Sequence, residues 1–180
     1  LAACPIGSSE GKRYFSAMSA GANYAWANRQ MIAHFVRKAW KSVFGPSAIS
    51  GLTALYDVAH NIAKIEKHNV NGELLELCLH RKGATRAFPP GHPEIPPKYQ
   101  AVGQPVIIPG SMGTASYILV GQDSGKDSWF SSCHGAGRMM ARQEAMRRVS
   151  GEQVVRDLEK KGIIVKCWSY RGIAEEAPLA

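Results

Sequence analysis

One segment of the chain combines a histidine with glycines in a pattern suited to phosphate chemistry. His134 is followed by Gly135 and Gly137 within residues 131–138, and we expect a helix over residues 138–148. Glycines let the backbone approach a ligand closely, and the free N–H groups at a helix start favour an anion such as phosphate. A neutral imidazole is available near pH 7 and can carry a covalent intermediate. From the spacing alone, a glycine turn that caps a helix, with an ordinary surface histidine, is the preferred interpretation, because Gly-x-Gly before a helix is common; His134 as a nucleophile toward phosphorus is the alternative.

A second glycine-rich turn lies at residues 109–116, after a short apolar segment that we expect to be a strand. Its backbone N–H groups, together with the hydroxyls of Ser111, Thr114 and Ser116, suit a nucleotide phosphate or sugar. No Gly-Lys-Ser/Thr follows, so the turn is not a Walker A loop. Taken by itself, the segment is a turn between two strands.

Histidines and cations also gather in the middle of the chain. His60 and His68 are eight residues apart, a spacing that forms no compact chelate by itself, and a lone histidine is usually a core or surface residue. Residues 81–86 are expected to form a loop in which Arg81, Lys82 and Arg86 surround a glycine. Such cations suit phosphate or RNA contacts, and the alternative is a charged hairpin tip.

These segments resemble motifs of the RtcB family of RNA-splicing ligases. The resemblance covers nearly the whole chain, with its blocks in the family's order. The blocks are GANYAWANRQ (residues 21–30), YDVAHNIAKIEKH (56–68), HRKGATRAFPPGHP (80–93), GQPVIIPGSMGTASY (103–117) and SCHGAGR (132–138).

The resemblance implies a GTP- and manganese-dependent RNA ligase. Such an enzyme joins an RNA 2′,3′-cyclic phosphate or 3′-phosphate end to a 5′-hydroxyl end, as in tRNA splicing or RNA repair. By resemblance, His134 attacks the α-phosphate of GTP and becomes guanylylated, and His60 is a manganese ligand. The implied nucleotide contacts are Asn61, Pro109, Gly110, Ser111, Met112, Ser116, Gly135, Ala136 and Gly137.

The chain departs from the family pattern at both ends. The family's other metal ligands, a cysteine and further histidines, belong to N-terminal motifs that these residues lack, and a lysine near the family's C-terminus is also missing. We therefore expect residues 1–180 to be the C-terminal portion of one RtcB-like ligase domain, inactive alone. Its expected partners are RNA, GTP, the N-terminal part of the ligase and an archease-like activator.

Composition leaves other functions open. The formal net charge of +8 suits a polyanion such as RNA, so a non-catalytic RNA-binding fragment is one alternative, and a metal-dependent phosphodiesterase is another. The four cysteines are scattered without a Cys-x-x-Cys pair, which favours a reducing compartment and a cytoplasmic protein. No apolar run in this sequence is long enough to span a bilayer.

The elements that must position these residues alternate irregularly, which favours an α+β fold of mixed sheets with flanking helices, like the RtcB catalytic fold. We expect residues 1–13 to be a loop and residues 14–44 a helix with an apolar stripe, ended by Gly45-Pro46. A capping-box pattern at Ser150 predicts a second helix over residues 152–161. Strands are expected at residues 52–59, 73–80, 104–108, 117–120 and 163–167, and residues 61–68 are short and mixed.

Overall fold

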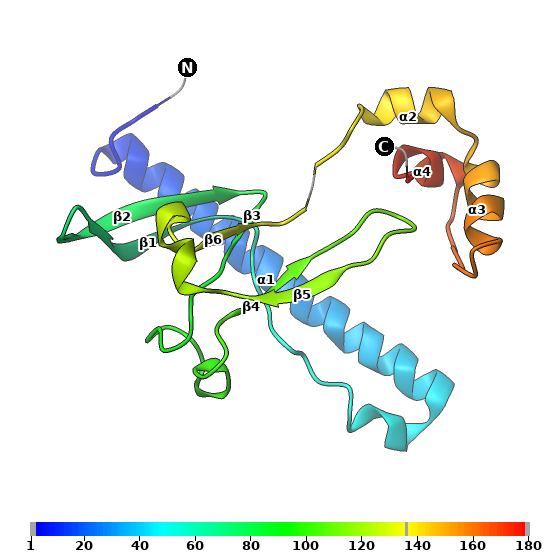
Figure 1. The fold of residues 1–180 in the computed structure, drawn as a ribbon, viewed down its shortest axis with the longest axis horizontal. Coiled ribbons are helices and arrows are strands. Elements are labelled where there is room, and N and C mark those ends of the chain that lie inside the picture. Colours follow the sequence, from blue (N-terminus) through cyan, green and yellow to red (C-terminus); the bar gives the residue numbers. More distant parts are fainter. Residues whose placement is uncertain (1–2, 136, 179–180) are drawn as a thin grey trace.

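The computed structural model describes residues 3–135 and 137–178. Within them, helices are combined with three separate two-stranded antiparallel sheets, in agreement with the expected α+β class (Figure 1). The helices are α1 (Ser9–Phe44), α2 (Arg142–Arg148), α3 (Gly151–Glu159) and α4 (Tyr170–Glu175). The strands are β1 (Asn61–Val70), β2 (Glu73–Lys82), β3 (Ala84–Arg86), β4 (Pro105–Ile108), β5 (Tyr117–Val120) and β6 (Ser131–Cys133).

Helix α1 is the longest element and runs behind the sheets (Figure 1). It begins at Ser9, so the loop expected as far as residue 13 is wrong. The side chain of Ser8 caps the helix by accepting a 3.0 Å hydrogen bond from the backbone N–H of Gly11. Its end at Phe44 is as predicted, because Gly45 adopts a φ of 85° that closes the last turn.

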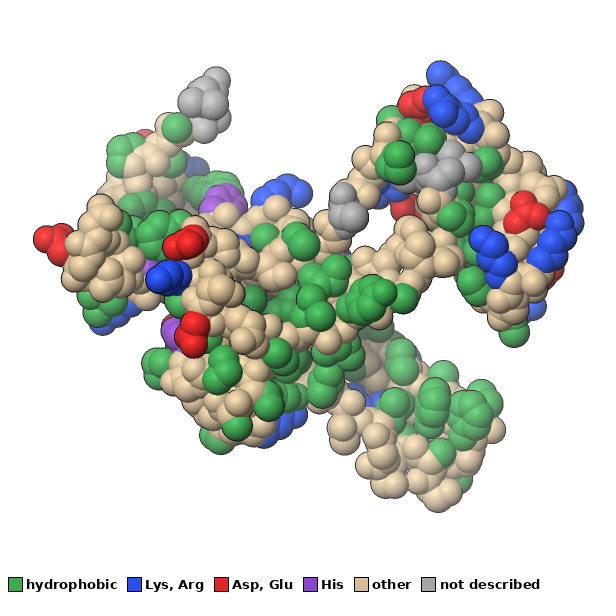
Figure 2. Space-filling model, in the orientation of Figure 1, with side chains coloured by type: hydrophobic (Ala, Val, Ile, Leu, Met, Phe, Trp, Pro, Cys, Tyr) green, Lys and Arg blue, Asp and Glu red, His purple; other side chains and the backbone are tan. Residues whose placement is uncertain are grey.

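The apolar stripe predicted on α1 is present but remains exposed. Its large side chains are Ile32, Phe35, Val36, Trp40 and Val43, and Val43 retains 73% of its accessible surface. Figure 2 shows this hydrophobic surface over the C-terminal half of the helix. A stripe of this kind normally faces a core. Among the described residues, no other element buries this apolar stripe of α1.

Strands β1 and β2 form a hairpin joined by the turn Asn71-Gly72. Both turn residues have positive φ, 54° and 94°, as a two-residue hairpin turn requires. Strand β2 was predicted at residues 73–80, whereas the mixed segment 61–68 becomes the regular strand β1. The register from this turn pairs Asn61 with Lys82 at the far end of the hairpin.

The loop expected at residues 81–86 is instead strand, interrupted only at Gly83. Strand β2 continues through Lys82, and β3 then pairs with β6, with Ala84 opposite Cys133 and Arg86 opposite Ser131. Gly83 has a φ of 68°, which permits the change of direction between β2 and β3. This part of the fold connects the hairpin to the segment that precedes His134.

Strands β4 and β5 form the third sheet, as predicted, and the turn between them reaches the C-terminal helices (Figure 1). Met112 in this turn packs against a small core of Val154, Leu158, Ile173 and Ala177. A second core lies under the proline-rich segment, where Phe88, Ile95 and Tyr99 are buried together. That segment contains no strand and only a short 3-10 turn, Pro97–Tyr99, as its prolines predict.

Helix α2 begins at Arg142, so the prediction that a helix starts at residue 138 is wrong. The guanidinium of Arg138 donates to Glu176 Oε2 at 2.7 Å and to the backbone carbonyl of Glu175, which ties this segment to the end of α4. Seven residues separate His134 from α2, and the predicted helix start beside the histidine is therefore absent from the described segment.

Two predicted strands are extended segments without strand partners. In residues 52–59, side chains from elsewhere bind the carbonyls: Arg37 donates to Leu52, and the Tyr99 hydroxyl donates to Leu55. In residues 163–167, Ile163 and Val165 pack against the C-terminal core instead of pairing. Helix α3 starts one residue before the predicted position and ends two before it, and α4 was not predicted. Among the described residues, no helix is long and apolar enough to cross a membrane.

Candidate active site

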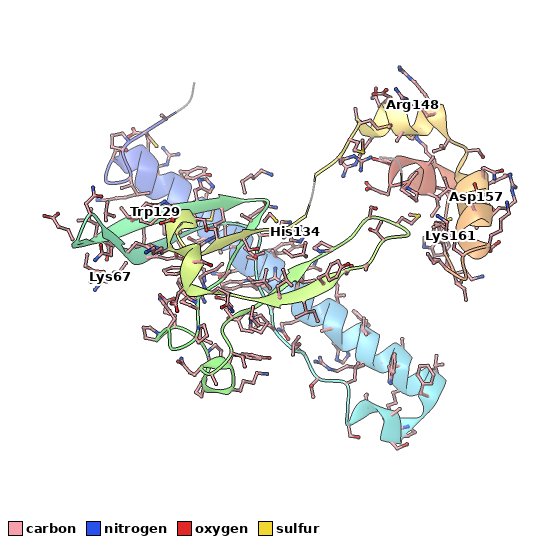
Figure 3. The ribbon with its side chains drawn as sticks, in the orientation of Figure 1. Lys67, Trp129, His134, Arg148, Asp157 and Lys161 are labelled. Atoms are coloured by element: carbon pink, nitrogen blue, oxygen red, sulfur yellow. The ribbon has the colours of Figure 1, made fainter. Side chains whose placement is uncertain are left out.

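The imidazole rings of His60 and His134 are stacked. Their centroids lie 4.0 Å apart and their planes are inclined by 24°. His60 immediately precedes β1 and His134 immediately follows β6. Figure 3 shows His134 near the centre of the molecule. The two histidines that the sequence assigned to metal binding and to catalysis therefore lie close enough to contact one bound triphosphate.

Backbone hydrogen bonds around Gly83 bring the two histidines together. The N–H of His134 donates to the carbonyl of Gly83 at 2.9 Å, and the N–H of Ala84 donates to the carbonyl of His60 at 3.2 Å. The N–H of Gly83 in turn donates to Asn61 Oδ1 at 2.9 Å. The turn between β2 and β3 thus holds His60, Asn61 and His134 in one place.

The surroundings of His60 favour its neutral form. Partial burial is the main cause that lowers the pKa of His60 below its ordinary value, followed by the positive charges of His134, Lys82 and Arg29. Arg29 is held on α1 by an ion pair with Asp57, with a Nε–Oδ1 distance of 2.7 Å. A neutral imidazole can bind a metal, and the nearby cations suit a polyphosphate. Arg29 therefore adds positive charge near His60 while its guanidinium is paired with Asp57.

The glycine-rich turn at residues 109–116 lies beside His134. A Cβ added at Gly135 would lie 3.7 Å from the carbonyl oxygen of Pro109, so the two segments approach closely. Within the turn, the N–H of Gly110 donates to Ser116 Oγ at 3.1 Å, and the Ser111 and Thr114 hydroxyls lie 3.2 Å apart. Of the implied nucleotide contacts, Asn61, Pro109 and Gly135 therefore lie close to the histidine pair, and the hydroxyls of the turn stabilise the turn itself.

The remaining implied contacts are placed differently. The side chain of Met112 packs against the C-terminal core. Gly137 has a φ of 77° and open space where a Cβ would be, and Ala136 lies outside the described residues.

The cations predicted to bind phosphate at residues 81–86 do not act as a group. Arg81 is 3% exposed and bonded to Glu66, so a phosphate role for it is wrong. Arg86 pairs with Glu94 at 2.7 Å and lies over the ring of Phe88. Only Lys82 is exposed and near His60. His68, the other histidine of the motif, is buried against Glu66 and takes no part in the site.

Arginines near α2 are mostly engaged in ion pairs. Arg138 and Arg142 both bind Glu176, at 2.7 and 3.1 Å, and Arg148 binds Glu144. Basic and acidic side chains are interspersed over α2 and α3 in Figure 2. This arrangement is typical of a solvated charged face.

A metal bound at His60 would need ligands from beyond the described residues. Among residues 3–135 and 137–178, no three His, Cys, Asp or Glu side chains converge. The imidazole of His60 is a suitable single donor, because a ligand must be unprotonated and burial favours that form.

The sequence contains one further local signal for the site. A two-residue hairpin turn at Asn71-Gly72 fixes the register, and counting outward from it places Asn61 opposite Lys82. Recognising segment 61–68 as a strand would have placed Lys82 next to His60. The proximity of Gly83 to His134 depends on the β3–β6 pairing and had no comparable local signal.

Comparison with known proteins identifies the family of this chain. A family model described as tRNA-splicing ligase RtcB matches residues 1–180. The tRNA-splicing ligase RtcB of Archaeoglobus fulgidus is 55% identical over 182 residues, which cover the whole chain and 38% of that protein. The protein of the same name from Pyrococcus horikoshii is 54% identical over 99% of the chain and 21% of its own length.

The RNA-splicing ligase RtcB of Mycobacterium bovis is 51% identical over the whole chain and 40% of its own length. The chain thus spans between a fifth and two fifths of the length of these relatives. The identities are high and the family match is unbroken from residue 1 to residue 180. This chain belongs to the RtcB family of tRNA-splicing ligases.

Proposed function

We propose that this chain forms part of the active site of a GTP- and Mn²⁺-dependent RNA ligase. The substrates are an RNA end with a 2′,3′-cyclic phosphate or 3′-phosphate and an RNA end with a 5′-hydroxyl. The observation that carries the proposal is the stacking of His60 and His134 at 4.0 Å, beside the turn that contains Pro109. The printed names of the relatives, which are RNA-splicing ligases, support the same reaction class.

In the proposed reaction, a ring nitrogen of His134 attacks the α-phosphorus of GTP. A P–N bond forms and the P–O bond to pyrophosphate breaks, which leaves a guanylylated histidine. Where the RNA end is a 2′,3′-cyclic phosphate, water first adds to its phosphorus and the bond to the 2′-oxygen breaks, which gives a 3′-phosphate. An oxygen of this 3′-phosphate then attacks the phosphorus of the guanylylated histidine and the P–N bond breaks. Finally, the 5′-hydroxyl attacks the 3′-phosphate and GMP departs. Each step exchanges one bond to phosphorus for another.

The residues of this chain have separate tasks in that scheme. The hydrogen bond from the backbone N–H of His134 to the carbonyl of Gly83 fixes the backbone position of the nucleophile. Lys82 and Arg29 provide positive charge near His60. The turn at residues 109–116 and Asn61 contact the nucleotide. Mn²⁺, with His60 as one ligand, offsets negative charge on the triphosphate when it is bound. These assignments follow the family motifs that the residues match.

We further propose that the chain works together with the rest of a longer ligase polypeptide. A compact protein of 19.5 kDa exposes about 8,500 Å², whereas this chain exposes 12,780 Å². The difference is in the range of a permanent interface, of the order of thousands of Å². The exposed stripe on α1 contributes to it. The larger protein would supply the other ligands for Mn²⁺, and any archease-like activator would act on it. A cytoplasmic location for that protein stays a prediction.

The test is transfer of label from GTP to protein. This chain replaces the matching segment of the Archaeoglobus fulgidus relative, giving a chimeric ligase that is incubated with α-labelled GTP and Mn²⁺. We expect an acid-labile, alkali-stable adduct, as a phosphoramidate gives. His134→Ala should reduce labelling to background, and His34→Ala, at an exposed helix position, should leave it unchanged.

Two results would contradict the proposal. A His134→Ala chimera that is still labelled would exclude this histidine as the nucleophile. A chimera that binds RNA but is never labelled would favour the alternative of an RNA-binding segment, which the net charge of +8 also suits. The 180-residue chain alone should label far less than the chimera, and robust labelling of it would show that the rest of the ligase is dispensable.

A further inference from the structure

Three buried polar side chains lie away from the histidine pair and take no part in the chemistry described above. Glu66, His68 and Arg81 are only 4%, 5% and 3% exposed. Arg81 binds both carboxylate oxygens of Glu66, at 2.8 and 2.9 Å, and His68 Nε2 lies 3.0 Å from Oε2 of the same group. Burial by itself raises the pKa of Glu66, but the hydrogen bonds from Arg81 and His68 outweigh it and lower the pKa. The pair is therefore charged and fully engaged.

A buried ion pair gives little net stability, because removing two charges from water offsets their attraction. Its geometry is more informative than its energy. Both residues sit on the β1–β2 hairpin, yet Arg81 has two further contacts outside the hairpin. Its Nε donates to Ser131 Oγ at 2.9 Å, and its NH2 group donates to the carbonyl of Trp129 at 3.1 Å. Arg81 thus links the hairpin to the segment that leads into His134.

That segment has a backbone conformation that needs support. Trp129 and Phe130 have φ values of 54° and 48°, in the left-handed region that side chains with a Cβ rarely adopt. The ring of Trp129 lies 5.4 Å from that of His68, so the buried cluster contacts this segment through a side chain as well. Surrounding contacts must hold such residues in place. Arg81 supplies one of them directly, at the carbonyl of Trp129.

The segment that follows is short enough for these contacts to decide its register. Strand β6 has three residues, Ser131–Cys133, and His134 comes next. Figure 3 shows Trp129 and His134 at opposite ends of this strand. A shift by one residue in a strand turns every side chain to the other face. Arg81 holds one end of β6 through its hydrogen bonds. The other end is held by the 2.9 Å hydrogen bond from the N–H of His134 to the carbonyl of Gly83.

We propose that Arg81, oriented by Glu66, is a positioning residue that fixes the register of β6 and thereby turns the His134 ring toward His60. The arginine touches neither histidine and acts through Ser131 and Trp129. Its consequence for ligation rests on the function proposed above, but the geometric claim concerns the folded chain alone. A planar guanidinium with five N–H donors is needed, because Glu66, Ser131 and Trp129 bind it from three sides.

The test compares Arg81→Lys with Arg37→Lys in this chain. Lysine keeps the positive charge toward Glu66 but cannot reach Ser131 and Trp129 at the same time. Arg37, on α1, donates through Nε to the carbonyl of Leu52 and is the matched control. The readout is the nuclear Overhauser effect between the His60 and His134 ring protons in NMR spectra of histidine-labelled protein. We expect it to disappear in Arg81→Lys and to persist in Arg37→Lys.

A second variant covers the case in which Arg81→Lys does not fold. Ser131→Ala removes one acceptor of Arg81 and leaves the buried ion pair intact, and we expect the ring contact to weaken at least twofold. An unchanged contact in a folded Arg81→Lys protein, or in Ser131→Ala if the lysine variant is unfolded, overturns the proposal.

The chimeric ligase separates positioning from binding. Misplacing the nucleophile should lower kcat for guanylylation at least tenfold with little change in the KM for GTP. A raised KM with the ring contact intact would instead indicate that Arg81 binds phosphate, and would overturn the proposal. If the ring contact disappears while even the unmutated chimera is never labelled, the positioning role stands and the ligase function fails.

Discussion

The side-chain oxygen of Asn61 accepts a 2.9 Å hydrogen bond from the backbone N–H of Gly83. The carbonyl of Gly83 also accepts a hydrogen bond from the backbone N–H of His134. Gly83 therefore links the side chain of Asn61 to the backbone of the proposed nucleophile. An asparagine that the family motif assigns to nucleotide binding therefore also has a structural task. Its amide nitrogen is the part left for a ligand, and substitutions can separate the two roles.

The first prediction concerns Asn61→Ala and Asn61→Asp. Alanine removes the acceptor for Gly83 and should lower the free energy of unfolding by about 1 kcal/mol in urea denaturation. Aspartate keeps the acceptor, so stability should remain close to that of the parent chain. Both variants should lose GTP affinity at least tenfold in equilibrium dialysis with the chimeric ligase, because neither has the amide nitrogen.

Asn69→Ala is the matched control for these variants. Asn69 accepts a hydrogen bond of the same 2.9 Å length from the N–H of Gly72, in a turn at the other end of the hairpin. It should lose similar stability and keep its GTP affinity. Unaltered GTP binding by Asn61→Asp would show that Asn61 does not contact the nucleotide.

The second prediction concerns pH and His92. Burial lowers the pKa of His92, whose ring stacks on the buried ring of Phe88 with centroids 3.5 Å apart. The folded state thus binds a proton less readily than the unfolded state, so stability is complete above the unfolded pKa of about 6.5 and declines as pH falls below it. His60 contributes in the same direction. Urea denaturation from pH 7.5 to 5.0 should show this decline.

Replacing His92 with glutamine should make the pH dependence shallower, because one group that resists protonation is removed. His34→Gln, at an exposed position on α1, is the control and should leave the slope as it is. A decline of equal steepness in the His92 variant would show that other groups cause it. Glu66 does not account for the decline in stability between pH 7.5 and 5.0, because its lowered pKa makes it titrate at more acidic pH.

The third prediction tests the contact between the turn at residues 109–116 and the C-terminal helices. Gly113 has a φ of 88°, and a Cβ added there would lie 2.9 Å from a methyl group of Leu158. Gly113→Ala should therefore lower the free energy of unfolding by roughly 1–3 kcal/mol, through backbone strain and overpacking. Thermal or urea denaturation measures the change.

Gly21→Ala provides the opposite control. Gly21 lies inside α1 with no atom within 4 Å of an added Cβ. Alanine is preferred over glycine in a helix, so this variant should be more stable by roughly 0.5–1 kcal/mol. If both glycine substitutions changed stability by the same amount, the contact of Gly113 with Leu158 would not matter.

The fourth prediction concerns the exposed stripe of α1. This chain, mixed with the separately expressed remainder of the Archaeoglobus fulgidus relative, should form a complex in analytical ultracentrifugation. Phe35→Asp should weaken it at least tenfold, because burial of such a ring contributes about 1.5–3 kcal/mol and 1.4 kcal/mol is a factor of ten. Lys38→Asp, off the stripe on the same helix, is the control for added negative charge.

Two other outcomes would show that the rest of the ligase does not cover the stripe. Equal binding by the Phe35 and Lys38 variants would exclude the stripe as the interface. A chain that forms dimers by itself, and that Phe35→Asp makes monomeric, would show that a second copy covers the stripe instead of the rest of the ligase.

Local sequence signals correctly predicted the elements that depend on near neighbours. The apolar period and Gly45 predicted most of α1. Strands β4 and β5 were also placed correctly. In each case the conformational preference is a property of residues a few positions apart, so the sequence carries it directly. The family motifs similarly named His60 and His134, whose chemical roles remain predictions.

Contacts between distant residues decided the rest. Segment 61–68 became a strand because β2 pairs with all of it, and Arg81 became a buried anchor because Glu66 and Ser131 lie on either side of it. Residues 52–59 stayed unpaired because no described strand lies beside them. The stacking of His60 on His134 depends on the β3–β6 pairing. Sequence fixes which groups are present, but only folding brings distant hydrogen-bond donors and acceptors together, and that pairing determines which residues form a site.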